Sequence, residues 1–108
     1  MSKPQKPETV VRNAIRETLL RIGVMVMTNA QIGRTHHGGL GCGSSDLVCC
    51  IRGRFVGLEV KTTTGVAAAN QLAWGERLEE NGGVYAVVRT PQEAVEVVQR
   101  VIAEARAA

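Results

Sequence analysis

The segment Gly57–Lys61, with the sequence GLEVK, contains residue types that can act on a phosphodiester. Side chains alternate along a strand, so Glu59 and Lys61 would share one face while their apolar neighbours pack on the other. A carboxylate can hold Mg²⁺, which takes oxygen ligands, and an ammonium can position water or stabilise transition-state charge. The same triplet also describes an exposed ion pair, so Glu59 and Lys61 alone do not establish a site.

Asp46, the only aspartate of the chain, supplies a second carboxylate. It follows a Gly-Ser segment and opens the apolar run 47–51, which is expected to pair with the strand that carries Glu59. Two carboxylates that converge at a sheet edge repel each other unless a cation lies between them. This convergence favours a metal site without excluding the ion pair. If the two residues are neighbours, Asp46→Ala should leave the metal-free fold at least as stable as before.

A helix is expected after the GLEVK strand, and Gln71 and Trp74 lie three residues apart on it. They therefore share one face of that helix. We expect Trp74 to pack on the sheet. Gln71 is a candidate for ordering a water molecule or contacting phosphate, and the alternative is a solvent-exposed amide.

The elements that must position these residues follow from apolar periodicity and from turn signals. Helices are expected at residues 8–22, 67–80 and from 91 onward, and strands at 24–28, 47–51, 55–61 and 84–89. The last helix has a strong start, with Thr90 as the cap, Pro91 at the first position and Glu93 at the third. The order α-β-β-β-α-β-α predicts an α/β domain in which the second and third strands form a hairpin.

Charge is distributed unevenly along the chain of 108 residues, whose formal net charge is +3. Residues 1–54 contain eight basic and three acidic residues, and residues 55–108 contain five basic and seven acidic ones. A basic first half is typical of a protein with a polyanionic partner, although an ordinary solvated surface gives the same balance. The candidate DNA or phosphate contacts are Arg12, Arg16, Arg34, His36 and His37. Solvated arginines and simple loop histidines are the alternatives, and the histidine pair is also a candidate for touching metal.

The composition indicates one globular domain, with residues 1–7 as an N-terminal tail and residues 8–108 as the domain. Hydrophobic residues make up 44% of the chain, which excludes a disordered protein. Aromatic residues make up only 3%, which argues against stacking platforms for single-stranded nucleic acid. The long irregular stretch 29–45 contains five glycines and is expected to be functional or mobile.

The cysteine count and the hydropathy of the chain bear on its cellular compartment. Three cysteines, an odd number, make no disulfide framework and favour a reducing cytosol. Cys49 and Cys50 are adjacent in an expected strand, so their side chains should point to opposite faces, which argues against a thiolate metal site. No apolar run is long enough to span a bilayer, and the polar start is not a signal peptide. We therefore expect no membrane association.

Four strings, in this order along the chain, resemble a known family: GCGSSDLVCC, FVGLEVK, QLAW and GGVYAVV. Together they are similar to a VRR-NUC domain, the virus-type replication-repair nuclease branch of the PD-(D/E)XK superfamily. The resemblance extends from about Glu8 to Val98. It implies a restriction-endonuclease-like α-β-β-β-α-β core, with a mixed central sheet flanked by helices, followed by a C-terminal helix.

The resemblance implies a role for each of six residues. These are Asp46 and Glu59 as metal ligands, Val60 as a backbone-carbonyl ligand, Lys61 as the catalytic lysine, Gln71 as the glutamine of the final motif, and Glu8 as the glutamate of the first helix that faces the site. Glu17 is the competing glutamate on that helix, and we favour a surface position for it. Ser45 stands where many members have proline.

The function that the resemblance implies is a DNA endonuclease that depends on Mg²⁺, or on Mn²⁺ in its place. Water would attack the phosphorus in line, and the 3′ oxygen would be the leaving group. The phosphate would then remain on the 5′ end. Small members of the family, often phage-encoded, resemble homodimeric junction-resolving enzymes, which implies branched or four-way-junction DNA and the cytoplasm of a bacterial or phage-infected cell.

The dimer contact and the function both have alternatives. The dimer would use an apolar helix face, such as Val95, Val98 and Ile102, unless these residues belong to the core. The alternatives to a nuclease are a non-catalytic nucleic-acid-binding module and an interaction subunit of a replication or repair complex.

Overall fold

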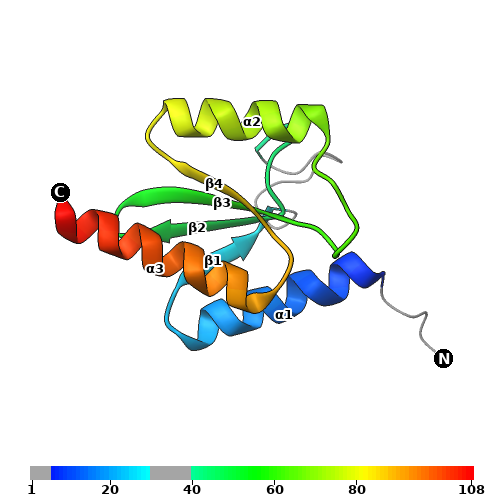
Figure 1. The fold of residues 1–108 in the computed structure, drawn as a ribbon, viewed down its shortest axis with the longest axis horizontal. Helices are drawn as coiled ribbons and strands as arrows, with labels where there is room; N and C mark the ends of the chain where they lie inside the picture. The colour runs from blue at the N-terminus through cyan, green and yellow to red at the C-terminus, as the bar shows by residue number, and fades with distance from the viewer. Residues whose placement is uncertain (1–5, 30–39) are drawn as a thin grey trace.

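The computed structural model describes residues 6–29 and 40–108. In these ranges the elements follow the predicted order α-β-β-β-α-β-α (Figure 1). They are α1 (Pro7–Arg21), β1 (Met25–Thr28), β2 (Leu47–Ile51), β3 (Arg54–Val60), α2 (Ala69–Glu80), β4 (Val84–Val88) and α3 (Pro91–Ala107). Each boundary lies within two residues of the predicted one.

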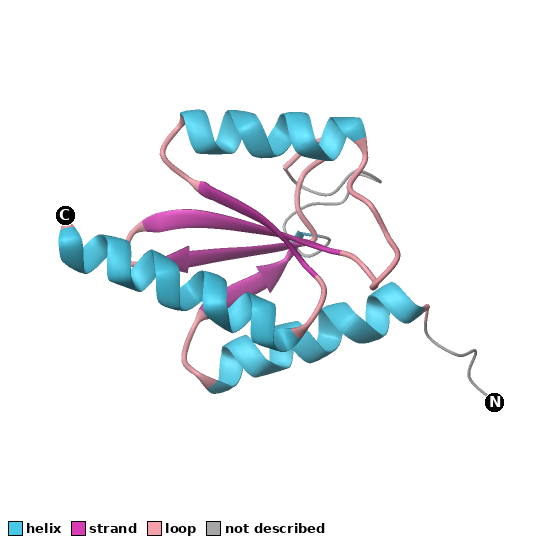
Figure 2. Ribbon diagram, viewed as in Figure 1, coloured by secondary structure: helices cyan, strands magenta, loops and turns pink. Residues whose placement is uncertain are grey.

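The four strands form one mixed sheet in the order β1-β2-β3-β4 (Figure 2). β1 pairs with β2 and β2 with β3 in antiparallel fashion, whereas β3 and β4 are parallel and are joined through α2. The predicted hairpin turns at Arg52 and Gly53, whose φ angles of 52° and 82° are both positive. Positive φ at both central residues is the geometry of a tight two-residue turn whose twist matches that of the flanking strands.

Helices cover the sheet on both faces. α1 and α3 pack together on one face, and α2 lies on the other, over β3 and β4 (Figure 1). The residues of β3 alternate accordingly: Leu58 and Val60 are buried in the core with α1 and α3, and Gly57 faces Trp74 of α2. The hydrophobic core therefore lies between the sheet and the α1–α3 pair, whereas Glu59 projects on the side of α2.

The ends of two helices are set by side chains. Thr90 accepts a hydrogen bond from the backbone N–H of Glu93 at 3.1 Å, as the predicted cap requires. At α2, the Gln71 side chain accepts a hydrogen bond from the N–H of Ala68 at 2.7 Å. This contact places the start of α2 at Ala69, two residues later than predicted.

The apolar face of α3 is mostly part of the core. Val98 is buried there, and Val95 and Ile102 are half-buried along a groove that Ile22 and Val24 also line. Val98 is therefore not available for the suggested dimer contact, and the alternative of an intramolecular core is confirmed for it. None of the helices in the described ranges is long and apolar enough to cross a membrane.

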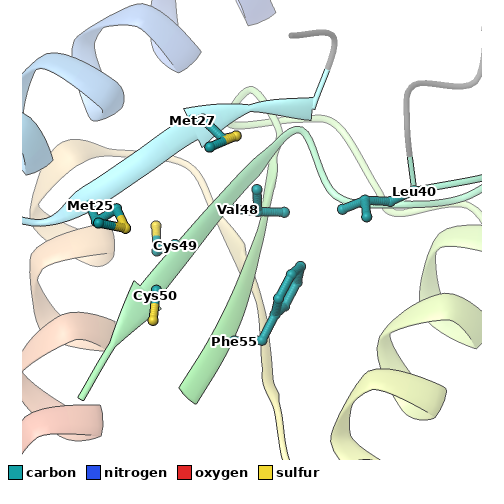
Figure 3. Close-up of a pocket in the computed structure, with 7 residues that line it drawn as sticks. All are labelled: Met25, Met27, Leu40, Val48, Cys49, Cys50 and Phe55. Carbon is teal, nitrogen blue, oxygen red and sulfur yellow. The ribbon is translucent and has the colours of Figure 1, made fainter. Parts of the chain in front are cut away.

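The part of the sheet that α2 leaves open carries an apolar groove (Figure 3). Its lining consists of Met25, Met27, Leu40, Val48, Cys49, Cys50 and Phe55. Cys49 is buried and Cys50 is exposed, as predicted for adjacent strand residues, and burial raises the pKa of the Cys49 thiol to about 12. All three cysteines are free. None of the described residues that line the groove is charged, so none of them offers a ligand for phosphate chemistry.

Candidate active site

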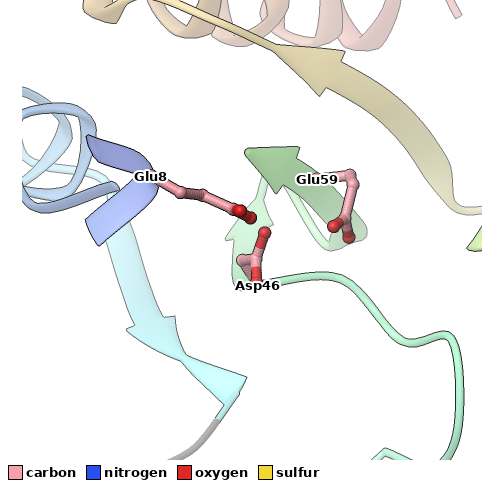
Figure 4. A group of neighbouring side chains, drawn as sticks. All are labelled: Glu8, Asp46 and Glu59. Atoms are coloured by element: carbon pink, nitrogen blue, oxygen red, sulfur yellow. The ribbon is translucent and has the colours of Figure 1, made fainter. Parts of the chain in front are cut away.

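Three carboxylates converge at one end of the sheet (Figure 4). Glu8 comes from the first turn of α1, Asp46 from the residue before β2, and Glu59 from near the end of β3. One oxygen atom of each lies within 4.8 Å of the others. Glu8 is exposed, Asp46 is half-buried and Glu59 is only 1% exposed, so the cluster extends from the surface into the protein.

Pairing of β2 with β3 brings Asp46 to Glu59. Leu47 pairs with Leu58, so the next position outward sets Asp46 opposite Glu59. The Asp46 Oδ2 atom accepts a hydrogen bond from the backbone N–H of Val60 at 3.0 Å. The N–H and C=O groups of one strand residue point to the same side, so the Val60 carbonyl also points to the side of β3 on which β2 and Asp46 lie. This geometry is compatible with the predicted role of that carbonyl.

Glu59 is a buried acid with uneven hydrogen bonding. Its Oε1 atom accepts a hydrogen bond from Gln71 Nε2 at 2.9 Å and lies 3.6 Å from Lys61 Nζ. Its Oε2 atom is buried, and no described residue hydrogen-bonds to it. Burial, the charge of Asp46 and a hydrogen bond with Asp46 raise the pKa of Glu59 to about 8, and Lys61 offsets this only in part. At neutral pH the metal-free protein therefore holds Glu59 mostly protonated.

The cluster has the donor chemistry of a divalent cation site. Mg²⁺ and Mn²⁺ take oxygen ligands, and three carboxylates supply them together with negative charge. Close carboxylates repel one another unless a proton or a cation lies between them. Glu8, Asp46 and Glu59 therefore fit such a cation.

Gln71 holds Glu59 rather than projecting into solvent. Its Oε1 atom accepts from Ala68 N–H and its Nε2 atom donates to Glu59, so the two ends of one amide cap α2 and hold the carboxylate. The alternative of a solvent-exposed amide is therefore wrong. Trp74 packs on the sheet as expected, with its ring centroid 6.2 Å from that of Tyr85. Burial and the charges of Glu59 and Asp46 raise the pKa of Tyr85 to about 12.

The two glutamates of α1 have different surroundings. Glu8 joins the carboxylate cluster, whereas Glu17 is exposed and lies 3.7 Å from Arg21, one turn further along the helix. The structure thus brings Glu8 and not Glu17 to the site.

Of the predicted DNA contacts, the structure describes two. Arg12 and Arg16 follow Glu8 at successive four-residue steps, so they lie on its side of α1. Both are half-buried, and their Nε atoms have no hydrogen-bond partner within the described ranges. Arg34, His36 and His37 lie outside the described residues.

Sequence reasoning missed Asn29, which holds the turn before Asp46. Asn29 is 6% exposed, and its side-chain amide donates to Ser44 Oγ at 2.5 Å and to the Ser45 carbonyl at 2.9 Å. Its backbone N–H donates to the carbonyl of Asp46 at 2.9 Å. The only signal in the sequence is a polar residue directly after an apolar strand, which does not identify its distant partners.

Arg89 was also missed, and it holds the loop that follows Lys61. One guanidinium nitrogen, Nη1, donates to the carbonyls of Thr62 and Gly65 at 2.5 and 2.6 Å. The Lys61 backbone N–H donates to the carbonyl of Val88, the residue before Arg89. Arg89 thus ties β4 to the loop on which the lysine side chain packs.

The mixed sheet, its helices and the carboxylates at the ends of its central strands define a restriction-endonuclease-like domain. Two solved structures are similar to it. One is described as "VRR_NUC domain", with 23% identity, coverage of 88% of this chain and 97% of that one, and a TM-score of 0.66. The other is described as "VRR_NUC domain protein", with 17% identity, coverage of 91% and 89%, and a TM-score of 0.71.

The chain has the fold of these VRR_NUC domains, which confirms the fold that its motifs imply. Comparison of sequences adds nothing further, because no family model and no curated protein matches the chain.

Proposed function

We propose that the chain is a divalent-metal-dependent endonuclease that hydrolyses phosphodiester bonds in DNA. The observation that carries this proposal is the cluster of Glu8, Asp46 and Glu59 with Lys61 beside it, since Lys61 Nζ lies 3.6 Å from Glu59 Oε1. A carboxylate cluster that faces phosphate without a cation would repel DNA. The VRR_NUC fold supports the same proposal.

Each residue of the site has a distinct part in the proposed reaction. Glu8, Asp46 and Glu59, with the Val60 carbonyl, would hold Mg²⁺ or Mn²⁺. The bound cation supplies a Lewis acid that neutralises phosphate charge and makes water a better nucleophile. Glu59 must lose its proton for the site to form, and Gln71 keeps its carboxylate oriented.

Lys61 acts on the substrate side of the cluster. Its side chain is only 14% exposed, and its ammonium lies 3.6 Å from Glu59 Oε1. From there it would orient the attacking water, or stabilise the charge that develops on the phosphate.

The DNA backbone would contact α1. Arg12 and Arg16 lie on the Glu8 side of this helix, and both residues are half-buried. Arg34, His36 and His37, in the segment between β1 and β2, are proposed as further contacts. The net positive charge of residues 1–54 supports a DNA contact on this part of the protein.

We further propose branched DNA as the substrate and a homodimer as the active form. The resemblance of the chain's motifs to those of small VRR-NUC members supports this substrate. A four-way junction needs two symmetry-related cuts, which a two-fold dimer supplies. The cytoplasm of a bacterial or phage-infected cell is the proposed compartment.

The test is cleavage of a labelled four-way junction and of linear duplex of the same arm sequence, each with Mg²⁺, Mn²⁺ or EDTA. We expect nicking of the junction with either metal and none with EDTA, and slower or no cutting of the duplex. Tight binding without cleavage in the presence of either metal would contradict the nuclease proposal and indicate a non-catalytic nucleic-acid-binding module. Absence of binding would indicate an interaction subunit.

A further inference from the structure

Three oxygen atoms are buried beneath α2, and none of them has a hydrogen-bond partner among the described residues. They are Ser45 Oγ, Glu59 Oε2 and Tyr85 Oη. Ser45 is 0% exposed and Glu59 is 1% exposed. A buried polar group that lacks a partner costs about 1–3 kcal/mol, so native proteins nearly always satisfy such groups. Because three such oxygen atoms lie on the same side of a small sheet, we looked for one partner that could satisfy all of them.

Gly57 connects the three residues in space. A Cβ atom built on Gly57 would lie 2.6 Å from Ser45 Oγ, so the serine hydroxyl rests directly on the strand at this glycine. Gly57 pairs with Tyr85 across the β3–β4 ladder, and it precedes Glu59 by two residues on the same face. Ser45, Tyr85 and Glu59 therefore surround one point on the face that α2 covers.

The side chains are long enough to meet there. Tyr85 is the diagonal neighbour of Glu59, at a spacing of about 7–8 Å between Cα atoms, which aromatic and long side chains bridge. The tyrosine ring is fixed by α2, because it packs against Gly75, where a Cβ would collide with it, and meets the edge of Trp74. The phenol can therefore move little, whereas the hydroxyl hydrogens of Ser45 and Tyr85 can rotate towards an acceptor.

We propose that Ser45 and Tyr85 are positioning residues whose hydroxyls hydrogen-bond to the Oε2 atom of Glu59 through a shared buried water. Two hydroxyls are donors and a carboxylate oxygen is an acceptor, so the three groups are chemically complementary. One buried water makes about three hydrogen bonds, which is the number of groups here. A carboxylate held in this way keeps one orientation within the cluster that it forms with Asp46 and Glu8.

The inference rests on the proposed metal site and concerns how firmly the chain holds Glu59. Hydrogen-bond partners behind a metal ligand typically contribute about 10- to 100-fold to metal affinity, because they fix the orientation of the ligand. Gln71 is one such partner on Oε1. Ser45 and Tyr85 supply the matching partners on Oε2, so that both carboxylate oxygens are oriented from within the protein.

The experiment is titration calorimetry with Mn²⁺ alone, without DNA, on Tyr85→Phe, Ser45→Ala and the double variant. Each single variant is expected to bind Mn²⁺ about 10-fold more weakly than the wild type. The double variant should lose less than the product of the two single effects, because both hydroxyls serve one oxygen. Thr64→Ala removes an exposed hydroxyl three residues after Lys61 and is the control, with unchanged affinity.

Thermal unfolding of the metal-free variants separates positioning from packing. If the hydroxyls only fill space, the variants change the melting temperature and bind Mn²⁺ like the wild type, which overturns the inference. If Asp46→Asn abolishes Mn²⁺ binding while Tyr85→Phe and Ser45→Ala do not weaken it, the inference fails and the metal site stands. A wild type that binds no Mn²⁺ overturns both. Should Ser45→Ala not fold, Tyr85→Phe decides alone.

Discussion

Asp46→Asn is expected to lower the rate of metal-dependent DNA cleavage by about 10³-fold or more while the fold is kept. The asparagine side chain retains an oxygen that can accept the hydrogen bond from Val60 N–H, now seen at 3.0 Å. It removes the charge that draws a cation to Glu8 and Glu59. Single-turnover cleavage of a junction in saturating Mn²⁺ measures the effect, and circular dichroism checks the fold.

Two further sets of variants test whether the loss of cleavage activity arises at the proposed metal site. Lys61→Met should cut about 10²–10⁴-fold more slowly yet still bind Mn²⁺, because the lysine acts on the reaction and not on the cation. Glu8→Gln should weaken Mn²⁺ binding, whereas Glu17→Gln, on the same helix and paired with Arg21 at the surface, should behave as wild type. Cleavage by Asp46→Asn at the wild-type rate would contradict the proposed site.

The second large effect is a pH dependence that originates in Glu59. Its pKa rises from 4.5 to about 8 on folding, so between these values the native state holds a proton that the unfolded state has lost. Stability from this group is therefore complete below about pH 4.5 and is lost as the pH rises to about 8. The free energy of unfolding of the metal-free protein should fall by up to about 1.4 kcal/mol per pH unit in this window.

Glu59→Gln isolates this contribution. A neutral amide imitates the protonated acid and keeps an acceptor for Gln71, so the variant should lose stability less steeply than the wild type as the pH rises. Urea unfolding at half-unit pH steps in EDTA provides the comparison, with Glu17→Gln as the control. Parallel curves for the wild type and Glu59→Gln would show that Glu59 titrates normally. The same proton competes with the cation, so Mn²⁺ affinity should increase with pH up to about 8.

Much of the fold could be predicted from local pattern. Apolar residues at helical spacing define α1, and alternation in GLEVK correctly places Leu58 in the core with Glu59 on the opposite face. Thr90 and Pro91 fix the start of α3 because capping depends on residues within one turn. The proximity of Asp46 and Glu59 also follows from local information, since a tight hairpin allows only one register that keeps the apolar faces aligned.

The rest depends on contacts between distant segments. Nothing in the spacing of Glu8 and Glu17 decides which one reaches the sheet, because that choice depends on how α1 packs against it. Asn29 hydrogen-bonds to a turn that is distant in the sequence, and the hydroxyl of Tyr85 is buried. Neither fact can be read from the composition or from local spacing. Long-range packing of this kind overrides local preference.

The hydrogen bond from Val60 to Asp46 also changes an expectation about stability. Relief of the repulsion between the Asp46 and Glu59 carboxylates would stabilise Asp46→Ala in the metal-free protein. Protonation of Glu59, whose pKa is raised, already removes most of that repulsion in the wild type. The alanine leaves the buried Val60 N–H without its acceptor, at a cost of about 1–3 kcal/mol. Asp46→Ala is therefore expected to lower the melting temperature, in contrast to Asp46→Asn.

The central claim is that Glu8, Asp46 and Glu59 together bind one divalent cation. A crystal grown at pH 8 and soaked in Mn²⁺ tests it most directly, because anomalous scattering locates manganese without reference to the rest of the density. We expect one strong anomalous peak in contact with carboxylate oxygens of all three residues, and no such peak in Asp46→Asn. A peak elsewhere, or an Asp46–Glu59 pair that stays in hydrogen-bond contact with no manganese between them, would contradict it.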